Sequence, residues 1–115
     1  YQCSKALLYL HSGGLIHRDL KPSNILIDSS CVLKLADLAL VETSRIGLIL
    51  TDYVVTRWYR APEILLGSQN YTKSIDIWSL GCILAEMILG KPLFPGTSTI
   101  NQLELIIELL GKPTT

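Results

Sequence analysis

Five side chains with catalytic potential stand close together in the first third of the chain. A histidine, a carboxylate, an ammonium group and an amide occur within eight residues, as His17, Asp19, Lys21 and Asn24, and a second carboxylate follows at Asp37. Together these groups could orient a hydroxyl, neutralise a phosphate and ligate a metal ion, which are the requirements of phosphoryl transfer. Taken singly, the histidine could equally be a core side chain and the carboxylates turn residues.

The predicted elements around this run bring the second carboxylate next to the amide. Two short apolar runs, 25–27 and 32–35, flank a polar stretch that favours a turn, and they predict a β-hairpin. Because a hairpin returns the chain to its starting end, Asn24 and Asp37 can meet as two oxygen ligands, which suits Mg²⁺. Pro22 predicts a rigid loop ahead of the first strand rather than a helix interior.

The remaining predicted elements are mostly helical. Residues 2–12 carry apolar side chains at helical spacing, and 75–89 is apolar almost all round, which predicts a helix buried on most sides. A short helix is expected over 61–66, and a long irregular loop over 37–59.

A last helix is expected to begin with a capping box. Thr99 is followed three residues later by Gln102, which is the spacing of that motif. The apolar face of this helix is predicted to consist of Ile100, Leu103, Ile107 and Leu110.

Composition argues against several classes of function. The 115 residues carry ten Lys and Arg against ten Asp and Glu, and a net charge of zero argues against a nucleic-acid partner. Hydrophobic residues reach 49% and the mean hydropathy is +0.38, but the longest apolar run contains two carboxylates and is too short to span a membrane. Three widely spaced cysteines, Cys3, Cys31 and Cys82, fit reduced intracellular thiols better than disulfides or a zinc site.

Three motifs resemble those of the eukaryotic protein kinases. The run 17–24 (His-Arg-Asp-Leu-Lys-Pro-Ser-Asn) resembles their catalytic loop, 37–39 (Asp-Leu-Ala) stands where they carry Asp-Phe-Gly, and 61–63 matches their Ala-Pro-Glu. The resemblance implies a protein-kinase-like α+β fold, as a partial, mainly α-helical large (C-terminal) lobe with a small β-hairpin by the catalytic loop. It also implies that residues 1–115 form one partial kinase domain, without the small lobe and the C-terminal helices.

The resemblance assigns roles to the residues of the site. Asp19 would accept the proton of the substrate hydroxyl, and Lys21 would neutralise charge on the transferring phosphate. Asn24 and Asp37 would hold the Mg²⁺ ions that bridge the phosphates of ATP, so that Asn24 serves catalysis, cofactor and metal, and Lys21 both catalysis and cofactor. Asp76 resembles the family aspartate that hydrogen-bonds the catalytic-loop backbone. Structural roles are implied for His17, Glu63 and Asp76.

Further details resemble the mitogen-activated protein kinases of the extracellular-signal-regulated type. Residues 51–53 (Thr-Asp-Tyr) match their double phosphorylation site, and 54–60 is similar to the segment that follows it. The resemblance implies that an upstream kinase phosphorylates Thr51 and Tyr53, and that the γ-phosphate of ATP goes to Ser or Thr before Pro in protein substrates. The residues implied to serve the phosphates and the activation segment are Arg18, Thr56, Arg57 and Arg60. Both Arg57 and Arg60 could instead pair with acids such as Asp52 or Glu63.

Two substitutions leave a second function open. Ala39 replaces the glycine of Asp-Phe-Gly, and alanine costs roughly 1 kcal/mol or more where the backbone must reach positive φ. Glu42 stands where these kinases usually carry an arginine, and it would repel a phosphate on Thr51. The alternative is a pseudokinase or scaffold that has lost switching.

Two expectations concern the chain as it stands. Without the small lobe that clamps ATP, the 115 residues alone are expected to be inactive, and a helical fragment that does not fold by itself is a third hypothesis. The cysteine usage and the resemblance together place the protein in the cytoplasm, the nucleus or both.

Overall fold

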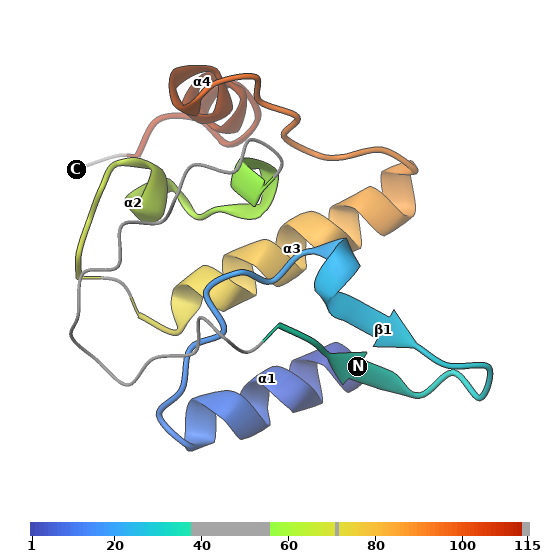
Figure 1. Ribbon diagram of the computed structural model, residues 1–115. Coiled ribbons are helices and arrows are strands. Elements are labelled where there is room, and N and C mark those ends of the chain that lie inside the picture. The colour runs from blue at the N-terminus through green and yellow to red at the C-terminus, as the bar shows by residue number, and fades with distance from the viewer. Residues whose placement is uncertain (38–55, 71, 114–115) are drawn as a thin grey trace.

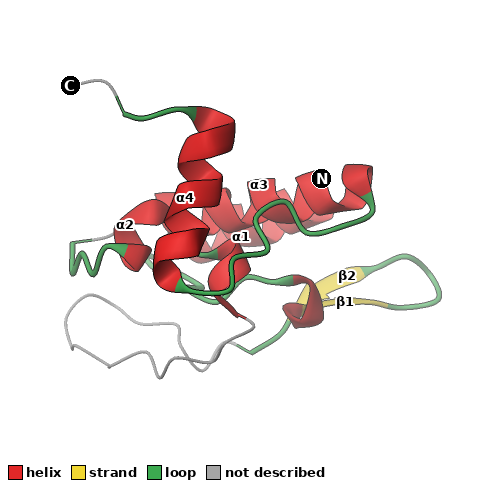
Figure 2. Cartoon of the chain, turned by 90° about the horizontal axis from the view of Figure 1, so that it is seen from above, coloured by secondary structure: helices red, strands yellow, loops and turns green. Residues whose placement is uncertain are grey.

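A central helix organises the structure. In this computed structural model, which describes residues 1–37, 56–70 and 72–113, α3 (Ser74–Leu89) runs through the middle. On one side of it lie α1 (Gln2–Ser12) and the hairpin, and on the other α2 (Pro62–Leu65) and α4 (Thr99–Leu110) (Figure 1). Seen from above, the hairpin projects to one side of the helices (Figure 2). This arrangement confirms the expected mainly helical fold with one small hairpin.

The hairpin has the predicted position. β1 (Ile25–Ile27) pairs antiparallel with β2 (Leu33–Leu35), so Val32 lies just outside the predicted second strand. One further bond, from Ala36 N–H to Asn24 O at 2.8 Å, continues the ladder toward the open end. The chain before β1 and the chain after β2 are therefore held side by side.

The side-chain amide of Gln2 ties α1 to the hairpin. Its Nε2 donates to Cys31 O at 2.7 Å, and its Oε1 accepts from Leu33 N–H at 2.9 Å. Because a two-stranded hairpin by itself is marginally stable in water, this double bond from α1 stabilises the hairpin.

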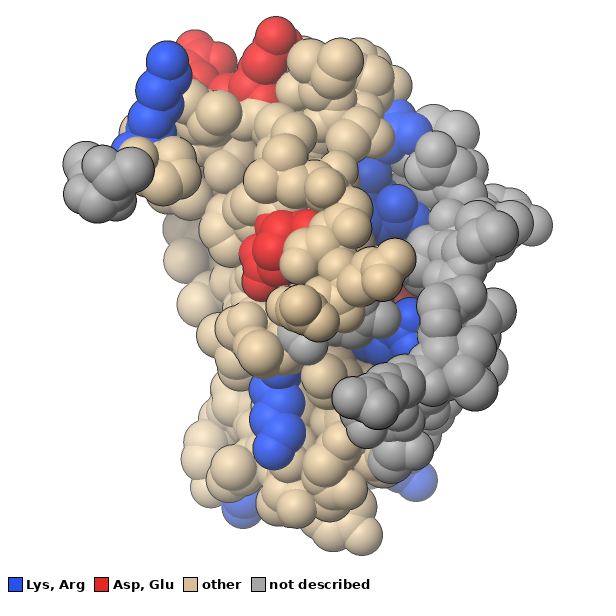
Figure 3. Space-filling view, turned by 90° about the vertical axis from the view of Figure 1, so that its left-hand side faces the viewer, with Lys and Arg blue, Asp and Glu red and all other residues tan. Residues whose placement is uncertain are grey.

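One hydrophobic core links all the helices longer than two turns. Leu7 of α1, Ile83 of α3 and Ile106 of α4 are all buried in it. Phe94, in the loop between α3 and α4, stacks on Trp78 with ring centroids 6.1 Å apart. The face turned to the viewer in Figure 3 is mostly uncharged, in keeping with the 17% share of charged residues.

The prediction that α3 is buried on most sides is wrong. Its buried residues form one stripe, Ile75, Asp76, Ser79, Cys82 and Ile83, at the spacing of one helix face. On the other side Met87 is 77% exposed, and Leu84 and Ile88 are also exposed. Within the described ranges no element packs over this second face, so its apolar residues are exposed although their spacing predicted burial.

None of the described helices is long and apolar enough to cross a bilayer.

The capping box predicted for α4 is also wrong. The N-cap is Ser98, whose Oγ accepts from Asn101 N–H at 3.0 Å, so the cap lies one residue earlier than expected. The predicted apolar face is not the buried one: Ile100 is 72% exposed, whereas Gln102 and Ile106 are buried. The polar side chain of Gln102 is buried because its amide bonds polar backbone groups.

Two single-turn 3₁₀ helices replace predicted loop. The run after Lys21 forms η1 (Pro22–Asn24), whose first turn accommodates the proline. The long loop predicted over 37–59 lies mostly outside the described residues, and its described end forms η3 (Thr56–Tyr59).

We expect the folded chain to lose stability between about pH 9 and pH 11. Burial of the Cys82 thiol, which is 4% exposed, raises its pKa to about 11, and the nearby Glu86 carboxylate adds to the shift. The folded thiol therefore keeps its proton in a range where the unfolded one has lost it, so rising pH favours the unfolded state by on the order of 2 kcal/mol. The raised pKa of Tyr59 acts in the same direction at higher pH.

Urea denaturation at pH 8 and pH 11 measures this loss. Cys82→Ala should reduce the difference between the two midpoints, whereas Cys31→Ala, at an exposed thiol, should leave it as in the wild type. Equal differences in all three proteins would contradict the assignment to Cys82.

Candidate active site

A buried carboxylate holds the loop that carries the candidate residues. Asp76 of α3 is 1% exposed; its Oδ2 accepts from His17 N–H at 2.8 Å and its Oδ1 from Arg18 N–H at 2.9 Å. His11 Nε2, on α1, lies 2.7 Å from the same Oδ2. Arg18 adopts φ 72°, a left-handed conformation uncommon outside glycine, and the two bonds to Asp76 hold this turn in place.

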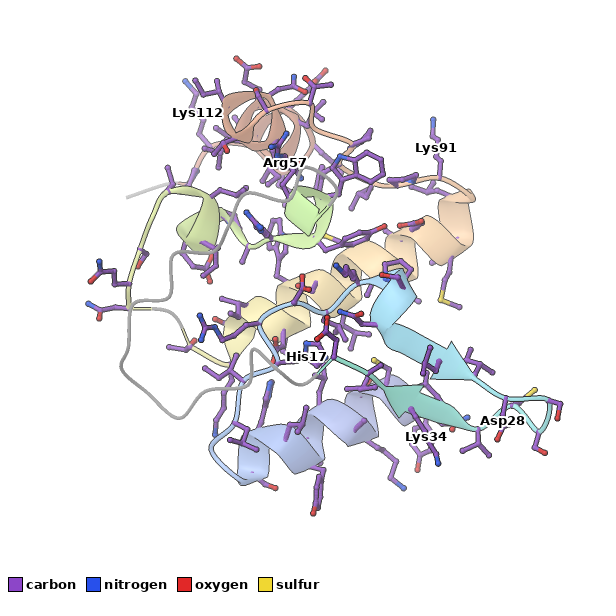
Figure 4. The ribbon with its side chains drawn as sticks, in the orientation of Figure 1. His17, Asp28, Lys34, Arg57, Lys91 and Lys112 are labelled. Carbon is purple, nitrogen blue, oxygen red and sulfur yellow. The ribbon has the colours of Figure 1, made fainter. Side chains whose placement is uncertain are left out.

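The imidazole of His17 links the loop to the chain after β2. The ring is fully buried, its Nε2 lies 3.0 Å from Ala36 O, and its Nδ1 accepts from Asp19 N–H at 3.3 Å. Because a carbonyl oxygen only accepts, these partners assign the proton to Nε2. Figure 4 shows His17 in the middle of the molecule, between α3 and α1. The His17 ring therefore connects the backbone of Asp19 to that of Ala36, the residue that precedes Asp37.

The structure brings three of the predicted residues together. Lys21 Nζ lies 3.3 Å from Asp19 Oδ2, and both side chains are partly exposed. Asn24 Nδ2 donates to Asp19 O at 2.8 Å, which fixes the backbone that carries the carboxylate. A carboxylate and an ammonium group thus lie side by side, each partly exposed, on a loop held by hydrogen bonds. Such a pair can accept a proton and balance the charge of an anion.

The two predicted metal ligands, Asn24 and Asp37, could supply only part of the coordination of a cation, and other groups would supply the rest. The bond from Ala36 N–H to Asn24 O places Asp37 one residue beyond the end of the ladder. Asp37 is exposed, and the Asn24 amide uses only its Nδ2 in the described part of the chain. No cluster of three or more His, Cys, Asp or Glu side chains exists among the described residues. Mg²⁺ commonly binds through one or two carboxylates with phosphate oxygens and water, so these residues fit that pattern.

Several predicted site residues lie outside the described residues. They are the phosphorylation sites Thr51 and Tyr53 and the departures Ala39 and Glu42. The side chain of Thr56, at the start of η3, is likewise not described.

Arg57 is buried, and no described acid pairs with it. Its Nη1 donates to Thr97 O at 2.8 Å, while its Nε has no hydrogen-bond partner among the described residues. Arg60 is half-buried, and Glu63 makes no ion pair within the described ranges. The alternative in which Arg57 pairs with Glu63 is therefore wrong.

Sequence reasoning missed three contacts around the site. His11 bonds Asp76 across 65 residues, and no local signal in the sequence indicates such a pair. Tyr59 OH donates to Glu86 at 2.6 Å, and Ser79 Oγ donates to Tyr59 O at 2.7 Å. These bonds fasten η3 to α3.

Comparison with known proteins then settles the family. A family model described as a protein kinase domain matches residues 1–113. The chain belongs to the protein kinase family. The family resemblance proposed from the motifs is confirmed.

The kinase chain is similar to mitogen-activated protein kinases over nearly its whole length. It is 58% identical to mitogen-activated protein kinase 15 of Xenopus laevis, over 99% of the chain and 20% of the relative. It is 54% identical to extracellular signal-regulated kinase 2 of Dictyostelium discoideum and 59% identical to extracellular signal-regulated kinase 7 of Drosophila melanogaster, again over 99% of the chain. The chain spans 33% and 13% of those two relatives. It thus corresponds to a third or less of their length.

Proposed function

We propose that the protein containing this chain is a Ser/Thr kinase of the mitogen-activated type, which transfers the γ-phosphate of ATP to protein Ser or Thr, preferentially before Pro. One observation carries the proposal: partly exposed Asp19 and Lys21 form an ion pair, and buried Asn24 bonds the Asp19 backbone, on a loop anchored by Asp76. Protein kinases generally use ATP and Mg²⁺, and this chain has the polar groups to receive both.

Each residue of the cluster has a task that its surroundings support. The Asp19 carboxylate is positioned to accept the proton of the attacking hydroxyl, because Asn24 and His17 both fix its backbone. Lys21, 3.3 Å away, would balance the negative charge of the phosphate oxygens. Asn24 and Asp37 would hold Mg²⁺, which when bound withdraws charge from those oxygens.

Regulation by phosphorylation is the second part of the proposal. Arg57 is buried with an unpartnered Nε and without an acidic partner among the described residues, so it offers a strong donor to a nearby anion. A phosphate on Tyr53, four residues earlier in the chain, would supply that anion, with Arg18, Thr56 and Arg60 as further candidates. An upstream kinase would add this phosphate and the one on Thr51, although Glu42 would oppose the latter.

The kinase hypothesis has more support than the pseudokinase or scaffold alternative. All three relatives compared above are named as kinases, and the acid, the lysine and the amide of the catalytic loop are present and correctly clustered. We further propose a cytoplasmic or nuclear location, which the free thiols Cys3, Cys31 and Cys82 support.

Phosphate transfer by the complete reading frame that contains this chain tests the proposal. With radiolabelled ATP and Mg²⁺, label should enter a Ser-Pro peptide, and chelation of Mg²⁺ should stop the reaction. Asp37→Asn should lower the rate by about 10²-fold or more, because one charged ligand of the metal is lost.

The matched control is Glu108→Gln, which neutralises an exposed acid on α4 and should leave the rate unchanged. Absence of transfer to any Ser or Thr peptide by the wild type would refute the kinase proposal and favour the scaffold alternative. Full activity of Asp37→Asn would refute the metal assignment.

A further inference from the structure

Gln102 of α4 is a fully buried amide. It is 0% exposed, its Oε1 accepts from Gly96 N–H at 3.0 Å, and its Nε2 donates to Trp58 O at 3.4 Å. Gly96 belongs to the loop between α3 and α4, and Trp58 to η3. One side chain of α4 therefore contacts both segments.

The loop bonds η3 in return. Trp58 Nε1 donates to Gly96 O at 2.9 Å, and Arg57 Nη1 donates to Thr97 O at 2.8 Å. Gln102, Gly96 and Trp58 thus form a closed ring of hydrogen bonds, in which each residue bonds the other two. The orientation of the Trp58 backbone is fixed by the position of α4.

A close backbone approach adds to these bonds. A Cβ atom placed on Gly96 would lie 2.7 Å from Gln102 Cα, well inside contact distance. The loop therefore lies directly on the backbone of α4, and only glycine allows this approach. Any larger residue must displace the loop carbonyls that Trp58 and Arg57 use as acceptors.

We infer that Gln102 and Gly96 are positioning residues for substrate selection. They hold η3 in the position from which it contacts the residue that follows the phosphorylated Ser or Thr. This inference rests on the proposed function and on the family resemblance, which implies that the segment 54–60, containing η3, sets the preference for Pro. In the described part of the chain, the Asp19 cluster takes none of its bonds from α4. Disturbing the ring should therefore change substrate choice and leave the chemical step intact.

The ratio of kcat/KM for a Ser-Pro peptide to that for a Ser-Ala peptide tests the inference in the complete reading frame. Gln102→Met keeps the volume and removes both bonds, and Gly96→Ala keeps the amide and displaces the loop. In each variant the ratio should fall about tenfold, while the KM for ATP stays unchanged. Glu104→Gln, at an exposed acid of the same helix, should keep the wild-type ratio.

This ratio separates positioning from stability. A variant that is only less stable contains less active enzyme, so activity toward both peptides falls equally and the ratio does not move. Should one variant fail to fold, the other still gives the result. Wild-type ratios in both would overturn the inference and leave the kinase proposal standing, since that proposal fails only if the wild type transfers no phosphate.

Hydrogen exchange tests the ring of hydrogen bonds independently of any measurement of enzymatic activity. The Trp58 indole N–H should exchange faster with solvent in Gln102→Met than in the wild type, whereas the Trp78 indole should not change. Equal exchange of Trp58 in both proteins would also overturn the inference.

Discussion

Replacing Asp19 by Asn is expected to lower kcat for peptide phosphorylation by about 10²- to 10⁴-fold, the range attributed to loss of a positioned general base. The amide has nearly the same shape, so the backbone bonds from Asn24 and to His17 remain. The loss is therefore chemical, because an amide oxygen cannot accept the hydroxyl proton. The free energy of unfolding should change by less than about 1 kcal/mol, since the ion pair with Lys21 is partly exposed.

The matched control is Asp28→Asn at the tip of the hairpin (Figure 4). Asp28 Oδ1 accepts from Ser30 N–H and Val32 N–H, and an asparagine can accept both bonds in the same way. This variant should keep the wild-type kcat. A residual rate of Asp19→Asn within threefold of the wild type would contradict the proposed role of the carboxylate.

Replacing Asp76 by Asn is expected to have the largest effect on stability. Its carboxylate accepts two backbone N–H bonds and contacts His11, all in a buried setting. An asparagine turns an NH₂ group toward one of these donors, so at least one buried N–H loses its acceptor. The unfolding free energy should fall by on the order of 3 kcal/mol. The kcat should fall as well, because the turn at Arg18 loses the bonds that hold it.

Chemical denaturation measures the first effect and peptide phosphorylation the second. Glu104→Gln neutralises an exposed acid and should change stability by less than about 0.5 kcal/mol. A double-mutant cycle with His11→Phe should show coupling between His11 and Asp76. If Asp76→Asn is as stable as the wild type, the carboxylate is not the anchor of the catalytic loop.

The elements that local rules govern were predictable. The hairpin was found because short apolar runs flank a polar turn, and the end of α3 because Gly90 can adopt φ 72° there. Spacing alone also brought Asp19, Lys21 and Asn24 into one site. These features depend on neighbours in sequence, which a reader of the sequence sees directly.

The features that failed depend on neighbours in space. Apolar periodicity placed Ile100 inside and ignored Gln102, because the surface that receives α4 is formed by backbone groups of Gly96 and Trp58, which require an amide. His11 gave no signal because its partner Asp76 lies 65 residues away. The role of Asp76 itself came from family resemblance and not from any spacing rule.

The double bond between Gln2 and the hairpin has a consequence for the order of folding. It joins residues only 29 and 31 positions apart, so its formation closes a short loop at small entropic cost. The Gln2 amide bonds the hairpin backbone through one donor and one acceptor, as a third strand would. Residues 2–35 are thus joined by contacts that are local in sequence, whereas the turn at His17 and Arg18 depends on Asp76, 59 and 58 positions away, so forming that turn requires a much larger loop to close.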